Sequence, residues 1–273
     1  MSSAVPFDPA RERAYGAGLA RAFGGALIFA FPLLMTMEMW SLGVAMEPVR
    51  LIAFVLLGLP LIYGLSDYAG FNAERGWRDD VLNTLSALAV GFVTSAALLG
   101  LFGLLGPDVA LHEAVGRIAL QTIPAAIGAT LARRQLSDAD DGDEDKASYF
   151  GEVFLMAAGA VVLAFNVAPT EEVILIAWQT ATWQLLLLAV ASIALLHVLV
   201  FSVGFAGQED AGHPGAAFFR FTIVGYALAL LVSLFLLWVF GRSEGLSTTM
   251  TVATAVVLAF PASLGAAVAR LLV

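Results

Sequence analysis

Two glutamates lie in long apolar stretches, and each follows a threonine by two positions. Glu38 lies in FAFPLLMTMEMW (29–40) with Thr36, and Glu172 lies in GAVVLAFNVAPTEEV (159–173) with Thr170. A carboxylate at the bilayer centre costs about 2.5–3.5 kcal/mol on insertion scales, so such residues usually face a bundle interior or a wet cavity. Hard cations such as Ca²⁺ prefer oxygen ligands. The pattern therefore predicts a cation site.

A proline near each glutamate indicates an interrupted helix. Pro32 and Pro169 have no N–H, so in a helix the carbonyl four residues earlier loses its donor. Free carbonyls would add oxygen ligands, and broken helices line the midplane sites of many transporters. A second interpretation stays open, in which both glutamates face the headgroups at the outer ends of their helices and have a structural role.

The two halves of the chain resemble each other, and the resemblance links the glutamates. GALIFAFPLLMTMEM (25–39) matches GAVVLAFNVAPTEEV (159–173) at an offset of 134 residues. In the same order, 70–71 matches 204–205, 90–92 matches 224–226, and PAAIGATLAR (124–133) matches PASLGAAVAR (261–270), the last at an offset of 137. These matches predict an internal duplication in which Glu172 is the counterpart of Glu38.

The composition is that of an integral membrane protein. Hydrophobic residues make up 60% of the 273 residues and charged residues only 13%, against about 25% charged in soluble domains. Because a membrane-spanning helix needs about 20 apolar residues, we expect an all-α polytopic fold with eight spans, at 22–41, 49–68, 82–105, 114–132, 149–168, 182–203, 218–240 and 248–271. The chain has no cysteine, which excludes disulfides and thiolate sites.

The basic residues predict the orientation of these spans. With a cytoplasmic N-terminus, ten arginines and lysines fall on the inner side, and only Arg50, Arg117 and Arg242 fall outside. This bias places both termini in the cytoplasm. We expect a cytoplasmic segment at 1–20, a four-helix repeat at 21–136, an acidic cytoplasmic linker at 137–148 and a second four-helix repeat at 149–273. Four spans per repeat make the repeats run in the same direction, as parallel transporter repeats do.

The predicted outer side is acidic, which would concentrate cations. It holds seven acids, among them Glu171 beside Glu172. After each glutamate, MWSLGVAMEP (39–48) and VILIAWQTAT (173–182) are candidates for short re-entrant or interfacial helices. His197 and Asp67 are candidates for a proton relay. A hydrogen bond to a neighbouring helix is the competing role for His197, and an interfacial position for Asp67.

The sequence contains no motif that indicates another class of function. There is no phosphate loop, HExxH or dinucleotide fingerprint and no G-x-S-x-G elbow, so we expect neither an enzyme nor a cofactor. No basic stripe suggests nucleic-acid binding. RAFGGALIFAFPLLMTMEMW (21–40) resembles an uncharacterised family of bacterial integral membrane proteins. That resemblance implies a bacterial inner-membrane protein and transfers no site.

The sequence thus predicts a channel or transporter for cations in the lipid bilayer. Glu38 and Glu172 would be the primary ligands, Thr36 and Thr170 would assist, and Glu171 would lie at the mouth. Ca²⁺ is the first candidate, with H⁺ coupling through the carboxylates or His197. The alternative is a non-transporting accessory subunit or lipid-binding scaffold. A homodimer would place four such glutamates in one assembly.

Overall fold

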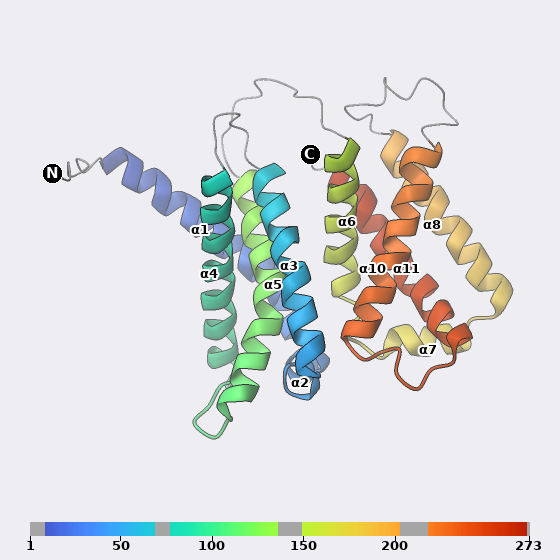
Figure 1. Ribbon diagram of the computed structural model, residues 1–273, viewed down its shortest axis with the longest axis horizontal. Helices are drawn as coiled ribbons and strands as arrows, with labels where there is room; N and C mark the ends of the chain where they lie inside the picture. The colour runs from blue at the N-terminus through green and yellow to red at the C-terminus, as the bar shows by residue number, and fades with distance from the viewer. Residues whose placement is uncertain (1–8, 69–76, 136–148, 203–217, 272–273) are drawn as a thin grey trace.

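The computed structural model describes residues 9–68, 77–135, 149–202 and 218–271, and every element in these ranges is helical (Figure 1). The predicted linker at 137–148 lies outside the described residues, as does the whole of the region at 203–217 with its predicted match 204–205. The elements are α1 (Pro9–Leu34), α2 (Met37–Ala45), α3 (Pro48–Tyr68), α4 (Trp77–Leu101), α5 (Leu111–Gln135), α6 (Tyr149–Phe165), α7 (Glu172–Gln179), α8 (Thr182–Ser202), the π-helical turn η2 (Phe218–Ile223), α10 (Val224–Val239) and α11 (Thr248–Leu271).

The predicted all-α polytopic fold is confirmed. Among the described residues, seven helical stretches are long and apolar enough to cross a membrane, and an eighth, α6, is shorter at 17 residues. Each predicted span coincides with one of these helices. The first and fifth spans end earlier than predicted, α1 at Leu34 and α6 at Phe165.

The two halves contain the same order of elements. In the first half α5 packs against α1, α2, α3 and α4; in the second, α11 packs against α6, α7, α8 and α10. Figure 1 shows the halves side by side, with the short helices α2 and α7 at the same end of the bundle. We call this the α2/α7 end. The connections 102–110 and 240–247 lie there too.

Glycine pairs let the central helix of each half approach its neighbour closely. A Cβ added to Gly25 of α1 would lie 2.2 Å from the carbonyl oxygen of Gly128 in α5. A Cβ added to Gly159 of α6 would lie 2.2 Å from that of Gly265 in α11. Backbones that approach this closely tolerate no side chain between them, as at small-residue crossings of membrane helices.

The ends of α4 and α10 correspond as well. Phe102 and Phe240 each donate their N–H to the carbonyl four residues earlier, and a glycine with positive φ follows in both halves, Gly103 at 71° and Gly241 at 70°. Only glycine adopts this backbone conformation without cost. The end of α4 therefore corresponds to the end of α10 at an offset of 138 residues, whereas the match of 90–92 with 224–226 used an offset of 134. The predicted match of 90–92 with 224–226 is therefore not a match in space.

The different packing of the two glycines in that match supports the correction. Gly91 faces the α5 backbone, whereas Gly225 faces Met156 of α6.

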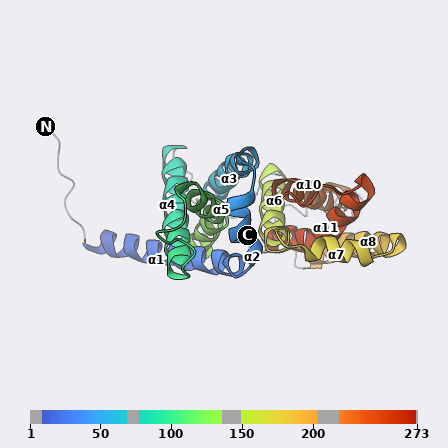
Figure 2. The ribbon, with the colours of Figure 1, turned by 90° about the horizontal axis from the view of Figure 1, so that it is seen from below.

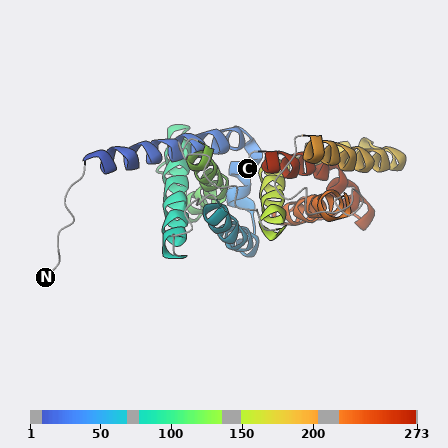
Figure 3. The same ribbon diagram turned by 90° about the horizontal axis from the view of Figure 1, so that it is seen from above.

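The halves meet where α3 packs against α6 and α10, as the views along the bundle show (Figures 2 and 3). Phe54 of α3 is only 3% exposed. Its ring centroid lies 5.2 Å from that of Phe165 and 6.2 Å from that of Phe240. Arg50 forms an ion pair with Glu244 of the other half. Within the described ranges, the junction thus combines an aromatic cluster with an ion pair.

Candidate functional site

The sequence predicted Glu38 and Glu172 at the outer ends of the first long helix of each half, but the structure places neither residue on that helix. Glu38 lies in the first turn of α2, and Glu172 is the first residue of α7. The long helices end before the glutamates because the chain turns at Thr36, whose backbone is extended at φ −92° and ψ 129°, and at residues 166–171. The predicted short helices after the glutamates are confirmed as α2 and α7.

The two threonines have the same role in their turns. The Thr36 hydroxyl donates to the Leu33 carbonyl at 2.8 Å, and its N–H donates to the same oxygen at 3.1 Å. Thr170 repeats this arrangement on the Val167 carbonyl, at 2.8 Å and 3.0 Å. Each threonine therefore closes the turn that precedes a glutamate. In this contact the threonine hydroxyl donates its hydrogen, so the lone pairs of the hydroxyl oxygen can still accept.

Three arginines pair with four of the seven acids predicted on the outer side. Arg50 contacts Glu47 and Glu244, Arg117 contacts Glu113 at 3.9 Å, and Arg242 contacts Glu171 at 3.2 Å. Each arginine side chain is only 14–16% exposed. These are the three arginines that the sequence placed outside. Their positions at the α2/α7 end are explained by ion pairing and burial.

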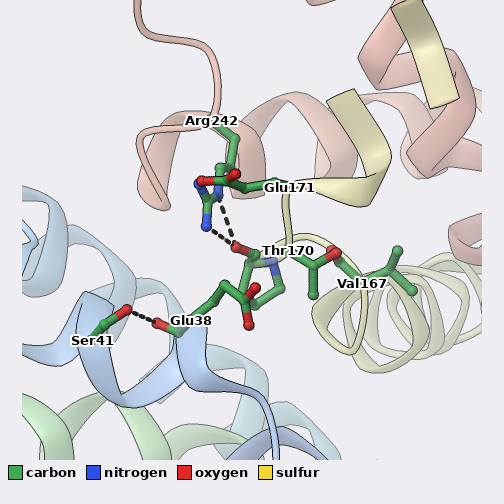
Figure 4. A network of polar contacts seen from close by, with 7 residues as sticks. Glu38, Ser41, Val167, Thr170, Glu171 and Arg242 are labelled. Atoms are coloured by element: carbon green, nitrogen blue, oxygen red, sulfur yellow. Dashed lines mark hydrogen bonds and ion pairs between the residues drawn. The ribbon is translucent and has the colours of Figure 1, made fainter. Parts of the chain in front are cut away.

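Arg242 fixes the turn before α7. Its Nε donates to the Pro169 carbonyl at 2.8 Å and its Nη2 donates to the same oxygen, while Nη1 reaches Glu171 (Figure 4). The Pro169 carbonyl and Glu171 are thus already bound by a cation, the guanidinium. Arg117 is anchored similarly by donating to the Leu104 carbonyl.

The repeated glutamates are in none of the ion pairs formed within the described residues. Glu38 is partly buried, and its backbone carbonyl accepts the Ser41 hydroxyl at 3.0 Å. In Figure 4 the Glu38 side chain extends from α2 toward the turn that carries Thr170 in the other half. Glu172 is exposed. The glutamates of the two halves therefore belong to neighbouring turns at one end of the bundle.

The surroundings of Glu172 favour its charged form. A hydrogen bond from its own backbone N–H, then the Thr170 side chain, and more weakly the charge of Arg242 hold the pKa of the Glu172 carboxyl below its ordinary value of 4.5. Partial desolvation opposes them. Glu172 is therefore an anion at neutral pH.

No preformed cluster of three or more histidine and acidic side chains suited to a metal ion occurs in the described part of the chain. A cation at this end would be held by few carboxylates, with carbonyl oxygens and water completing its shell. Ca²⁺ accepts such mixed oxygen shells.

The two relay candidates lie away from the glutamates along the chain and differ in environment. His197 of α8 shares a hydrogen bond of 2.9 Å between Nδ1 and the hydroxyl of buried Thr222 in η2. The competing role for His197, a hydrogen bond to a neighbouring helix, is therefore confirmed. Asp67 is exposed at the last turn of α3, and the structure does not bring it together with His197.

Gln121 of α5 links two helices, because it donates from Nε2 to the Ala30 carbonyl of α1 at 2.6 Å. Sequence reasoning missed the arginine anchors. It used Arg50, Arg117 and Arg242 only to set orientation. Arginines are rare on the predicted outer side, and this indicated that each has a specific partner, because an unpaired buried charge is costly.

Comparisons with known proteins bear on the whole chain. A family model described as "Putative integral membrane protein (DUF2391)" matches residues 18–273. No curated protein and no solved structure gives a significant match. The family match covers both halves and all the helices from the middle of α1 onward. The chain belongs to this family of integral membrane proteins.

Proposed function

We propose that this membrane protein binds cations at the α2/α7 end and moves them across the bilayer, with Glu38 and Glu172 as the charged ligands. One observation carries the proposal. The arginines at this end pair with four acids, and the two glutamates that correspond between the halves are left out of those pairs. They remain available to a mobile cation.

The turns before α2 and α7 suit weak and reversible binding. Two carboxylates balance the charge of one Ca²⁺, which takes six to eight oxygen ligands. The threonine hydroxyls can accept from water or face the ion through their free lone pairs. An ion held this way keeps part of its hydration. Conduction needs such binding, favourable enough for entry and weak enough for release.

Protons compete for the same carboxylates, which supports H⁺ coupling. Because the pKa of Glu172 is lowered, this side chain releases its cation to protons only in acid. Glu38 lies in the other half with a different set of neighbours.

The alternative, an accessory subunit or lipid-binding scaffold, rests on a different observation. Both glutamates occupy the first turn of a short helix, where a carboxylate stabilises the helix by about 0.3–1 kcal/mol through the helix dipole. That role needs no ligand. It predicts small losses of stability on substitution by glutamine and no cation flux.

Ca²⁺ flux into proteoliposomes containing an internal indicator tests the proposal. The wild type, Glu38→Gln and Glu172→Gln are compared with Glu47→Gln, a matched control whose carboxylate is 70% exposed and contacts Arg50. The Ca²⁺ flux through Glu38→Gln and through Glu172→Gln should each fall about tenfold or more. A tenfold loss corresponds to only about 1.4 kcal/mol. The Coulomb attraction of two unit charges 4 Å apart near a protein surface is larger, about 4 kcal/mol.

Two results would contradict the proposal. Robust wild-type flux that neither glutamine variant reduces would remove the glutamates from the pathway. No flux of Ca²⁺, Na⁺, K⁺ or H⁺ by folded wild-type protein would favour the scaffold.

A further inference from the structure

The junction inside the chain uses surfaces that also exist at its two far edges. At the junction α3 packs against α6 and α10. In the order of elements, α8 is the counterpart of α3, and α1 and α4 are the counterparts of α6 and α10. Figure 1 shows α8 at one edge of the molecule and α1 and α4 at the other. The two surfaces that form the junction therefore recur at opposite edges of the molecule.

The receiving surface recurs in its aromatic residues. Phe165 and Phe240, with ring centroids 5.3 Å apart, receive Phe54 at the junction and are 2% and 3% exposed. Their counterparts Phe31 and Phe102 also form a ring pair, with centroids 6.2 Å apart. This pair is 45% and 46% exposed. We call Phe31 and Phe102 the open ring pair, since no third ring from the described residues covers it.

The inserting surface recurs on α8. The α3 residues in contact with the second half include Arg50, Phe54 and Gly64, the last of which lies against the Phe154 ring. Their counterparts on α8, at the offset of 134 residues, are Gln184, Leu188 and Val198, which we call the α8 stripe. Gln184 and Val198 are exposed and Leu188 is partly buried. Gln184 cannot repeat the ion pair of Arg50, so this face relies on apolar packing.

The first helix gives an independent observation at the same edge. In Figures 1 and 3 the N-terminal part of α1 extends beyond α4, away from the bundle. Its Tyr15 is 66% exposed, whereas the counterpart Tyr149 donates its hydroxyl to the Arg220 carbonyl and stacks under its guanidinium. Among the described residues, no helix covers the protruding part of α1, where residues 15–17 are exposed.

We propose that a second copy of this chain covers these surfaces, with the α8 stripe of one copy packed against the open ring pair of the other. Lipid tails are as apolar as these side chains, so exposure alone would not distinguish lipid from protein. The same two kinds of surface already pack together within the chain, which favours a second copy over lipid. An interface between unlike surfaces either closes into a ring or continues as a filament.

The arrangement of the halves favours closure with two copies. Figure 2 shows the halves turned relative to each other, because α1 lies along one long edge whereas its counterpart α6 lies against α3. Successive halves joined by this contact follow a curve. Two copies supply four halves and satisfy both surfaces of each copy, which is the smallest closed assembly.

Cysteine cross-linking tests the interface, since the chain has no cysteine of its own. Leu188→Cys and Phe102→Cys are placed in separately tagged full-length chains, co-expressed, and treated in native membranes with a short bis-maleimide. We expect a covalent dimer that carries both tags. The matched control replaces Phe102→Cys with Ile52→Cys, an apolar α3 position near the same end that is 57% exposed. A chain with both Phe54→Cys and Phe240→Cys should link internally and shows that the reagent reaches this depth.

The mass of the untreated wild type in nanodiscs is measured in parallel and should be that of two chains. Three results would overturn the proposal. The first is internal linkage of Phe54→Cys and Phe240→Cys without a dimer from Leu188→Cys and Phe102→Cys. The second is an equal dimer yield with Ile52→Cys, which means random collision. The third is a monomer mass, which leaves lipid on both surfaces.

Discussion

Replacing Gly25 with alanine should destabilise the fold, because α1 and α5 cross there without room for a methyl group. The added Cβ would lie 2.2 Å from the Gly128 carbonyl oxygen and 2.3 Å from the Ala132 Cβ. Favourable contacts between carbon atoms begin at about 3.5 Å, so the helices must separate by more than about 1 Å. Overpacking of this kind costs about 1–3 kcal/mol, and we expect the upper end because two backbones must move.

The neighbouring residue provides the matched control. A Cβ on Gly24 would have no atom within 4 Å, and alanine gains about 1 kcal/mol over glycine in a helix interior in water. Thermal unfolding in detergent micelles, followed by circular dichroism, should therefore rank Gly25→Ala below the wild type and Gly24→Ala at or above it. Equal midpoints for Gly25→Ala and Gly24→Ala would refute the close crossing of α1 and α5.

Three further substitutions test other parts of the structure. Arg242→Met removes the donors to Pro169 and Glu171 and should cost about 1–3 kcal/mol, measured by the same thermal unfolding, while exposed Arg78→Met should be near neutral. Thr170→Val removes the side-chain hydroxyl that helps to lower the pKa of the Glu172 carboxyl, so the Glu172 titration followed by NMR should move to higher pH; an unchanged midpoint would contradict this effect of Thr170. Because a lowered carboxyl pKa stabilises the fold above the unfolded-state pKa and this stability is lost as pH falls through the folded pKa, Thr170→Val should also reduce the difference in stability between neutral and acidic pH. Phe54→Ala should cost about 3 kcal/mol by loss of the junction cluster, against less than about 1 kcal/mol for Leu56→Ala, which is 61% exposed on the same helix.

The long helices could be predicted from the sequence because each is a long apolar stretch. The ends of α1 and α6 could not, because apolar residues continue on both sides of each turn. What ends these helices is local hydrogen bonding, by the Thr36 and Thr170 hydroxyls and, in the second half, by Arg242. Hydropathy does not report such contacts.

The candidate site was predictable only in part. The repeat of threonine and glutamate located both turns, since duplicated polar residues in apolar sequence are conspicuous. The ion pair that separates Glu171 from Glu38 and Glu172 joins Glu171 to Arg242, which is 71 positions away along the chain. A sequence comparison of the halves does not show that pair, and its offset of 134 residues matches α4 with α10 about one turn of helix out of register.

The central claim is that the glutamates of the two halves act on one cation path. Ca²⁺ flux through Glu38→Gln, Glu172→Gln and the double variant, reconstituted at equal protein density, tests this claim most directly. Residues that serve one site are not additive, so the double variant should be little slower than the slower single variant. The shared path would be contradicted if the fold-reductions in flux of the two single variants multiply in the double variant. It would also be contradicted if all three variants keep wild-type flux.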